Sequence, residues 1–162
     1  MQVVPILQAL CLLTLANGTP VIVKKVLGFY MAFPLDAGIR FFDGRPLFGA
    51  SKTIRGIVAS ILVTGCLAPL LGASVVTGGI VAVLAMIGDL SSSFVKRRLS
   101  LPPSTRALGL DQIPESLLPL LACLKLLSLT LVDVVICAVV FLVGELVISR
   151  LLYGLHVRDQ PY

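Results

Sequence analysis

The sequence predicts an all-α integral membrane protein with five transmembrane helices, its N-terminus outside and its C-terminus in the cytoplasm. Two observations favour this fold class. First, 57% of the 162 residues are hydrophobic and only 13% are charged, whereas a soluble domain is about half apolar and about a quarter charged. Second, the apolar residues gather in runs long enough to cross about 30 Å of hydrocarbon. At this length we expect a single membrane domain, residues 1–162.

The first predicted span, residues 3–23, is interrupted by the segment from Ala16 to Pro20. Proline removes a backbone donor from a helix, and Gly18 loosens it further. The interruption is either a simple kink or a break that turns Asn17 and freed carbonyl groups toward a polar cavity, since broken helices at membrane depth normally line one.

Two polar stretches, residues 24–56 and 96–113, are predicted to be cytoplasmic loops. The first combines prolines and an Asp-Gly turn with phenylalanines, a mixture that fits a segment lying on the membrane surface. Asp133 marks the turn between the last two apolar runs, and a short polar tail covers 153–162. We predict the remaining spans at about 57–71, 75–95, 114–132 and 134–152.

The cations set the predicted orientation, because cytoplasmic loops of membrane proteins are enriched in Lys and Arg. On this topology every Lys and Arg except Lys125 falls on one side, which we assign to the cytoplasm. We therefore expect a multi-pass protein of the cell membrane. The residues on that side are Lys24, Lys25, Arg40, Arg45, Lys52, Arg55, Lys96, Arg97, Arg98, Arg106, Arg150 and Arg158.

The net charge of +5 does not indicate a nucleic-acid partner, because aromatic residues make up only 6% of the chain and Trp is absent. The cations fit anionic lipid head groups or phosphorylated substrates better. Cys11, Cys66, Cys123 and Cys137 all lie in apolar runs without Cys-x-x-Cys spacing, so we interpret them as packing residues. The sequence leaves the oligomeric state open.

The most informative stretch runs from Gly88 to Arg98 and places a carboxylate, three hydroxyls and three cations at the end of an apolar run. In a helix, Asp89, Ser92, Ser93 and Lys96 share one face. Ionisable residues this close to a membrane span are costly and usually functional. The structural alternative for Asp89 is an intramembrane ion pair with Lys96 or a neighbouring Arg.

Asp111 begins the fourth predicted span and provides a second carboxylate on the cytoplasmic side. By itself, an Asp at this position is equally explained as a helix N-cap. Together, Asp89 and Asp111 suit Mg²⁺, which proteins usually hold with one or two carboxylates plus substrate phosphates.

Several cations lie close enough in sequence or topology to neutralise phosphate oxygens beside such a metal. Lys52, Thr53 and Arg55 precede the second span, where a helix N-terminus also favours anions. Lys96 and Arg97 follow Asp89, and Arg suits bidentate phosphate contacts. For each cation alone, a topological or lipid-binding role explains the sequence better, but the closeness of Lys96 and Arg97 to Asp89 weakens that alternative.

Lys125 and Glu145 are the remaining charges inside predicted spans. We interpret them first as a structural ion pair, with a proton or ion relay as the alternative. Together with the broken first span they leave a small transporter or channel open as a second function class. A structural membrane subunit that only binds lipids is the third.

Five motifs in this order resemble the CDP-archaeol synthase family, whose members are CTP-dependent lipid cytidylyltransferases related to bacterial CDP-diacylglycerol synthases. The likeness covers most of the chain. The motifs are Ala16-Asn17-Gly18-Thr19-Pro20, Pro34 to Gly38, Asp43 to Gly56, Gly88 to Arg98, and Asp111-Gln112.

The resemblance implies a nucleotidyltransferase of phospholipid biosynthesis, a CTP:2,3-bis-O-(geranylgeranyl)-sn-glycerol 1-phosphate cytidylyltransferase. An isoprenoid ether-lipid phosphate, unsaturated archaetidic acid, would attack the α-phosphate of CTP and give CDP-archaeol and pyrophosphate. Asp89, Lys96 and Asp111 would be catalytic, with Asp89 and Asp111 holding Mg²⁺. The implied substrate and phosphate contacts are Asn17, Asp43, Lys52, Thr53, Arg55, Ser93, Lys96 and Arg97.

The chain departs from this family pattern at two positions. Relatives often carry an acidic residue directly after the Phe-Gly pair, where this chain has Ala50. They often carry another acidic residue three positions after the Asp of Asp-Gln, where this chain has Pro114 followed by Glu115. Whether Glu115 takes that second place is a question for the structure.

Overall fold

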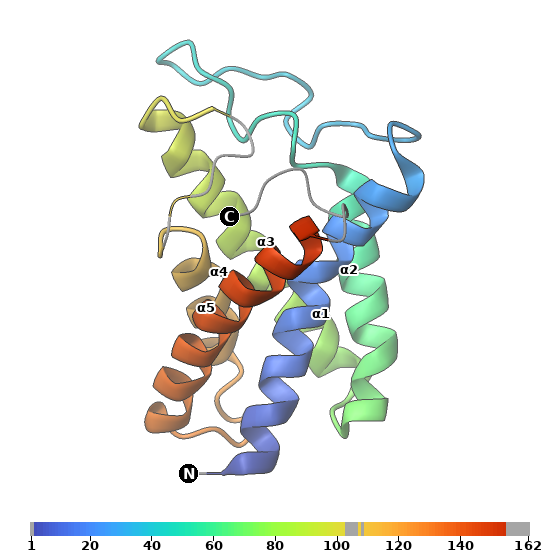
Figure 1. Cartoon of the computed structure of the whole chain (residues 1–162), viewed down its shortest axis with the longest axis vertical. Helices are drawn as coiled ribbons and strands as arrows, with labels where there is room; N and C mark the ends of the chain where they lie inside the picture. Colours follow the sequence, from blue (N-terminus) through green and yellow to red (C-terminus); the bar gives the residue numbers. More distant parts are fainter. Residues whose placement is uncertain (1, 103–106, 108, 155–162) are drawn as a thin grey trace.

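The computed structural model describes residues 2–102, 107 and 109–154, which form a bundle of helices joined by turns (Figure 1). The predictions for Arg106, Arg158 and the polar tail beyond Gly154 lie outside these residues. The described part contains no strand, only two isolated bridges. In order, the elements are α1 (Val3–Leu27), α2 (Ile54–Leu67), η1 (Ala68–Leu71), α3 (Val75–Arg98), α4 (Gln112–Ala122) and α5 (Leu131–Gly154).

The all-helical membrane class is confirmed, but the predicted number of spans is not. Among the described residues, four helices are long and apolar enough to cross a membrane: Val3–Leu27, Ile54–Leu71, Val75–Arg98 and Leu131–Leu151. Helix α4 has 11 residues, which makes it about 17 Å long and too short to cross the hydrocarbon by itself.

The predicted span 114–132 is wrong as a continuous helix, and the following turn explains why. Thr130 and Asp133 form a reciprocal cap at the start of α5: the Asp133 carboxylate accepts from the Thr130 backbone N–H, and the Thr130 hydroxyl accepts from the Asp133 N–H. This capping box starts α5 at Leu131, earlier than predicted. Upstream, Pro119 lacks the backbone donor that would bond Glu115 in α4.

The first helix passes through Pro20 without ending, so the interruption predicted from the sequence is not a break in the helix. Pro20 cannot donate to the carbonyl of Ala16, and the Ser60 hydroxyl of α2 donates to that oxygen instead, at 2.7 Å. The freed carbonyl therefore joins two helices and does not face the cavity. Asn17 does line a cavity, as described below.

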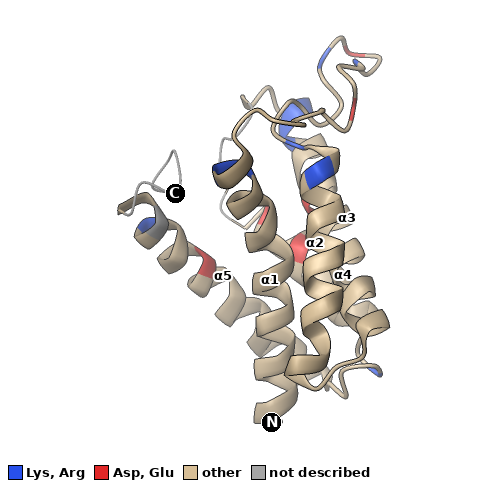
Figure 2. Cartoon of the chain, turned by 90° about the vertical axis from the view of Figure 1, so that its right-hand side faces the viewer, with Lys and Arg blue, Asp and Glu red and all other residues tan. Residues whose placement is uncertain are grey.

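The apolar core lies between the lower halves of the helices. It includes Leu12 and Leu13 of α1, Val81 of α3 and Leu120 of α4, all almost fully buried. Helix α5 joins this core through its first half, with Val134, Cys137 and Phe141. Beyond that point α5 leans away from α1 (Figure 2).

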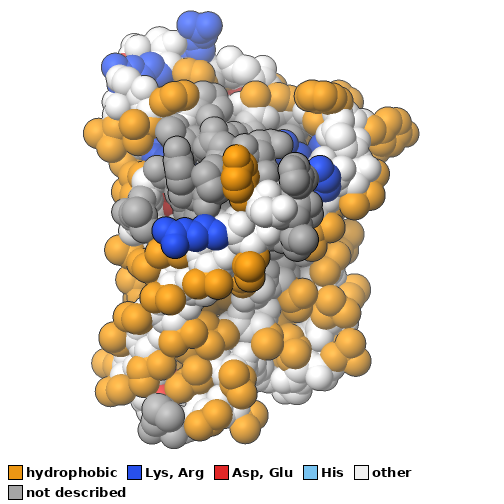
Figure 3. Space-filling view, viewed as in Figure 1, with side chains coloured by type: hydrophobic (Ala, Val, Ile, Leu, Met, Phe, Trp, Pro, Cys, Tyr) orange, Lys and Arg blue, Asp and Glu red, His pale blue; other side chains and the backbone are white. Residues whose placement is uncertain are grey.

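The polar segments gather at the opposite end of the bundle from the N-terminus. Figure 2 shows most Lys and Arg at that end, where α1 and α3 finish and α2 begins. Hydrophobic side chains cover most of the face below it (Figure 3). The first connecting loop is shorter than predicted, residues 28–53, because α1 continues through Lys24 and Lys25 to Leu27 and α2 begins at Ile54.

Candidate functional site

A cavity of ≈ 780 Å³ lies at this polar end, a volume typical of small-molecule sites. Its walls come from helices α1, α2, α3 and α5, from the loop that precedes α2, and from the start of α4. Six cations and four carboxylates among the described residues line it: Lys24, Lys25, Lys52, Arg55, Lys96, Arg97, Asp89, Asp111, Glu115 and Glu145. Asn17, Thr53 and Ser93 line it as well.

Asp89 is held at the centre of this arrangement by Lys52. The Lys52 ammonium forms an ion pair and a hydrogen bond with Asp89 Oδ2, so the predicted ion pair of Asp89 involves Lys52 and not Lys96. Burial lowers the pKa of Lys52, but its attraction to Asp89 is strong enough that the net pKa is raised. Lys52 therefore stays charged at neutral pH.

Lys52 reaches Asp89 because the chain turns sharply before α2. Thr53 is the N-cap of that helix, and its hydroxyl accepts from the Gly56 backbone N–H at 3.4 Å. Thr53 also forms an isolated bridge with Pro34, which ties the end of the loop to its beginning. Gly56 lets the start of α2 pack closely against α1, since a Cβ there would lie 3.3 Å from Pro20 Cβ.

A second ion pair joins Lys96 of α3 to Asp111, with 2.6 Å between the ammonium nitrogen and Oδ1. Both side chains are largely buried, 8% and 12% exposed. Asp111 stands at the N-cap position of α4, yet its side chain does not cap that helix. Its other oxygen, Oδ2, accepts from the backbone N–H of Ala107 at 3.3 Å. The carboxylate is thus directed to Lys96, and the cap interpretation does not account for it.

Glu115 belongs to the same cluster, which answers the question left by Pro114. Its buried carboxyl group lies close to that of Asp89 and interacts with it. Two carboxyl groups lie this close at little cost only when a proton or a cation is shared between them. Their proximity depends on Gly88: a Cβ there would lie 2.4 Å from the Pro114 carbonyl oxygen and 2.7 Å from the Glu115 nitrogen.

These carboxylates fit a hard divalent cation that is only partly coordinated by protein. Among the described residues, no group of three or more His, Cys, Asp and Glu side chains converges to hold a metal by itself. Mg²⁺ characteristically takes one or two carboxylates and fills its remaining positions with phosphate oxygens and water. The Asp89–Glu115 contact provides two such oxygen donors in one place.

Of the predicted cations, Arg97 and Arg55 are partly engaged by the backbone. Arg97 Nη2 donates to the Pro102 carbonyl at 2.9 Å, and the side chain is almost fully buried. The Arg55 guanidinium donates to the carbonyls of Gly28 and Tyr30, beyond the end of α1. Arg55 thus helps to shape the cavity wall as well as to charge it.

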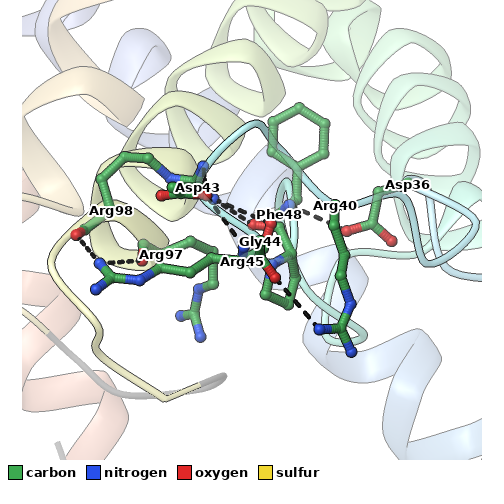
Figure 4. A network of polar contacts seen from close by, with 9 residues as sticks. Asp36, Arg40, Asp43, Gly44, Arg45, Phe48, Arg97 and Arg98 are labelled. Carbon is green, nitrogen blue, oxygen red and sulfur yellow. Dashed lines mark hydrogen bonds and ion pairs between the residues drawn. The ribbon is translucent and has the colours of Figure 1, made fainter.

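Asp43 is the one predicted site residue that does not line the cavity. It is exposed, and its Oδ1 accepts from Arg98 Nη1 at 2.7 Å (Figure 4). Arg98 also donates to the Pro46 carbonyl, and Arg45 donates back to the carbonyl of Arg98. The guanidinium of Arg98 stacks on Phe41 and Phe94, 4.9 and 4.8 Å from the ring centroids. Asp43 therefore fastens the 36–49 loop to the end of α3.

The predicted ion pair between Lys125 and Glu145 is not formed. Lys125 is exposed in the turn after α4, whereas Glu145 lines the cavity. Glu145 lies 14 residues into α5, about 21 Å from its start. Sequence reasoning left the role of Glu115 open and assigned Glu145 to an ion pair, so it placed neither in the cavity. An acidic residue inside an apolar run was the available signal for both, but only the packing of α4 and α5 showed where they point.

Comparisons with known proteins agree on one family. The profile of the CarS-like family, described as CDP-archaeol synthase, matches residues 3–162. A CDP-archaeol synthase of Pyrobaculum islandicum is 33% identical over 154 residues, which cover 91% of each chain. Another, of Hyperthermus butylicus, is 38% identical over 104 residues, or 60% of this chain and 59% of that one. A third, of Pyrococcus furiosus, is 36% identical over 107 residues, or 60% of each.

A solved structure is similar over nearly the whole fold. It is described as an intramembrane enzyme for archaeal membrane lipid biosynthesis. The two chains share 31% sequence identity with a TM-score of 0.70, and the match covers 85% of this chain and 90% of the other. The family resemblance drawn from the five motifs is therefore confirmed.

Proposed function

Because this chain belongs to the CDP-archaeol synthase family, we propose that it transfers the cytidylyl group of CTP to an isoprenoid ether-lipid phosphate. The product would be CDP-archaeol, and pyrophosphate would leave. The specific acceptor that we propose is 2,3-bis-O-(geranylgeranyl)-sn-glycerol 1-phosphate, unsaturated archaetidic acid. The observation that carries the proposal is one cavity in which six cations and four carboxylates meet at the polar end of a membrane bundle.

The reaction requires a site that offsets negative charge more than one that supplies a nucleophile. An oxygen of the lipid phosphate forms the new bond to the α-phosphorus of CTP, and the bond between the α- and β-phosphates breaks. The attacking lipid phosphate is already an anion, so no protein base is needed to deprotonate it. Positioning and electrostatic stabilisation then provide most of the catalysis.

We assign the cations of the cavity to the phosphates. Lys52, Lys96 and Arg97 extend from two elements toward the same space, which suits a triphosphate that must be held along its length. Asn17, Thr53, Arg55 and Ser93 supply further polar contacts from the walls. Asp43 is assigned a positioning role, through Arg98 and the loop, and no substrate contact.

Asp89 and Asp111, with Glu115 beside Asp89, would hold Mg²⁺. When bound, the ion would neutralise charge on the phosphate oxygens and help to orient the triphosphate. Glu115 is our addition to the predicted pair, since its carboxyl group contacts Asp89 and lies one residue after the expected position.

We propose that the cavity faces the cytoplasm of a cell-membrane protein, with residues 1–162 forming one membrane domain. The cations of the polar end support this orientation. The lipid would keep its isoprenoid chains in the bilayer while its phosphate enters the cavity. Lys24 and Lys25, near the end of α1, line the cavity and would attract the lipid phosphate.

A transporter, the alternative drawn from the sequence, is not supported. The charged residue pair that motivated it is not formed, and the family match covers nearly the whole chain. A midplane site with access from both sides would be expected of a transporter. Most of the Lys and Arg lie instead at one end of the bundle.

The proposed reaction is tested by incubating the purified full chain with CTP, MgCl₂ and the unsaturated archaetidic acid in mixed micelles. We expect a CDP-lipid product and one pyrophosphate per product, abolished by EDTA and restored by added Mg²⁺. Asp89→Asn should lower kcat/KM by about 100-fold or more, the scale seen when one preorganised electrostatic group is lost. Full turnover by Asp89→Asn would contradict the metal assignment, and absence of product from the wild type would contradict the reaction.

A further inference from the structure

Each of the two aspartates assigned to the metal is already paired with a lysine. Lys52 contacts Asp89, and Lys96 contacts Asp111 at 2.6 Å. Lys52 is also within electrostatic range of Glu115 and Asp111, and Lys96 of Asp89. The lysines therefore place positive charge on the same carboxylates that a divalent cation would use. A metal ion can bind Asp89 only in competition with the Lys52 ammonium.

This competition is strong because the pair is poorly solvated. The side chains of Lys52 and Asp89 are only 22% and 21% exposed, and a charge in such a place needs a counter-charge. With Lys52 present, Asp89 is satisfied without metal. Without Lys52, Asp89 and Glu115 would lose their nearest counter-charge, and the acidic pair would attract cations more strongly.

A triphosphate gives Lys52 an alternative partner. Lysine carries a point charge on a flexible four-carbon stem, so its ammonium can move several ångströms without moving the backbone. Lys52 stands on the loop just before α2, in the wall of the cavity that also contains Lys96 and Arg97. If nucleotide phosphates bind there, the ammonium can move from the carboxylate to a phosphate and leave Asp89 to the metal.

We propose that Lys52 is a resident counter-cation of Asp89 that yields its place to the metal only when nucleotide binds. The inference rests on the proposed function for the identity of the nucleotide. Lys52 is thus a positioning residue with two partners, the carboxylate in the empty site and a phosphate in the loaded site. It makes metal binding and nucleotide binding depend on each other, and by linkage the dependence is reciprocal.

The test is a binding measurement on the full chain in nanodiscs, with Mn²⁺ as probe and the Mn²⁺ retained with the nanodiscs after ultrafiltration as readout. Matched samples without protein give the free Mn²⁺ that remains beside the Mn–CTP complex, and affinities are compared at equal free Mn²⁺. For the wild type we expect weak binding of Mn²⁺ alone and binding at least about 10-fold tighter with saturating CTP, within the usual range of coupling between sites. Lys52→Met should bind Mn²⁺ alone about 10-fold tighter than the wild type, and CTP should add little to this affinity.

Two further variants separate this effect from altered folding or non-specific charge. Lys125→Met removes an exposed lysine at the turn after α4 and should leave both Mn²⁺ affinities unchanged. Lys52→Met combined with Asp89→Asn should lose the gain, because the gain depends on the freed carboxylate. Thermal unfolding of each variant verifies that the fold is retained.

The inference is overturned if folded Lys52→Met binds Mn²⁺ alone no more tightly than the wild type, or if it keeps the full enhancement by CTP. Neither readout requires turnover. Failure of the proposed reaction would appear separately, as a wild type that binds Mn²⁺ and CTP together but releases no pyrophosphate with the lipid acceptor.

Discussion

Asp36 takes no part in the cavity, yet its carboxylate determines the shape of the loop above it. One oxygen accepts from the backbone N–H of Gly38, and the other accepts from those of Phe48 and Gly49, at 3.0 and 2.8 Å. The loop then runs directly into Lys52. Burial raises the pKa of Asp36, but the three backbone donors outweigh it and the net pKa is below the ordinary value.

Asp36→Ala should therefore destabilise the loop, since it leaves buried N–H groups unsatisfied at about 1–3 kcal/mol. The pH dependence has a defined sign. Because the folded pKa is lowered, the stabilising effect of Asp36 is present at pH values above the ordinary pKa of 3.8. It is lost as pH falls through the still lower folded value.

Thermal unfolding of the wild type and Asp36→Ala across this acid range measures the contribution. The difference in midpoint between the two proteins should shrink as pH falls, because protonated Asp36 no longer accepts all three donors. A difference that stays constant down to the lowest pH would contradict the role assigned to the carboxylate.

At the scale of elements, the site depends on how closely α3 and α4 approach each other. Gly88 lies against the backbone of Pro114 and Glu115, so the glycine that precedes Asp89 is a spacing residue. The close approach brings Glu115 into contact with Asp89. The same contact positions the start of α4, where Asp111 lies beside Lys96.

Gly88→Ala should separate these helices, because its Cβ would lie 2.4 Å from a backbone oxygen that cannot move aside by itself. Overpacking of this kind costs about 1–3 kcal/mol. We expect a lower unfolding temperature and a weaker Mn²⁺ affinity in the presence of CTP. Gly79→Ala, on the same helix with nothing within 4 Å, is the matched control and should change neither quantity.

For the whole molecule, the segregation of Lys and Arg to one end is the basis on which we predict its orientation in the bilayer. The 36–49 loop and the ends of α1 and α3 lie at the polar end, and the turn that contains Lys125 joins α4 to α5. If the cationic end is cytoplasmic, this turn faces the opposite side together with the N-terminus.

Single cysteines can test this orientation. Phe42→Cys would place a thiol at a fully exposed loop position, 100% exposed in the structure, and Lys125→Cys would place one in the opposite turn. A membrane-impermeant maleimide applied to intact cells should label Lys125→Cys above the background of the parent chain and Phe42→Cys only after lysis. The reverse pattern would place the cavity outside.

The sequence by itself determined the membrane class and the family, and it indicated most of the polar residues that the structure brings to the cavity. Apolar runs and the one-sided cations follow from local composition, which needs no knowledge of packing. The motif from Gly88 to Arg98 indicated Asp89, Ser93, Lys96 and Arg97, and the structure brings all four to one cavity. Charged residues are rare in apolar runs, so the few that occur there can be recognised in the sequence as candidate site residues.

Only the tertiary structure decided which charges meet. It paired Asp89 with Lys52, from a distant loop, and not with Lys96, which shares its helical face. It brought Glu115 and Glu145 to the cavity, directed Asp43 to Arg98, and ended α4 at Ala122. These outcomes depend on how closely helices approach and on which distant side chains can satisfy one another. Helical periodicity shows which residues share a face, but the partner of that face is set by packing.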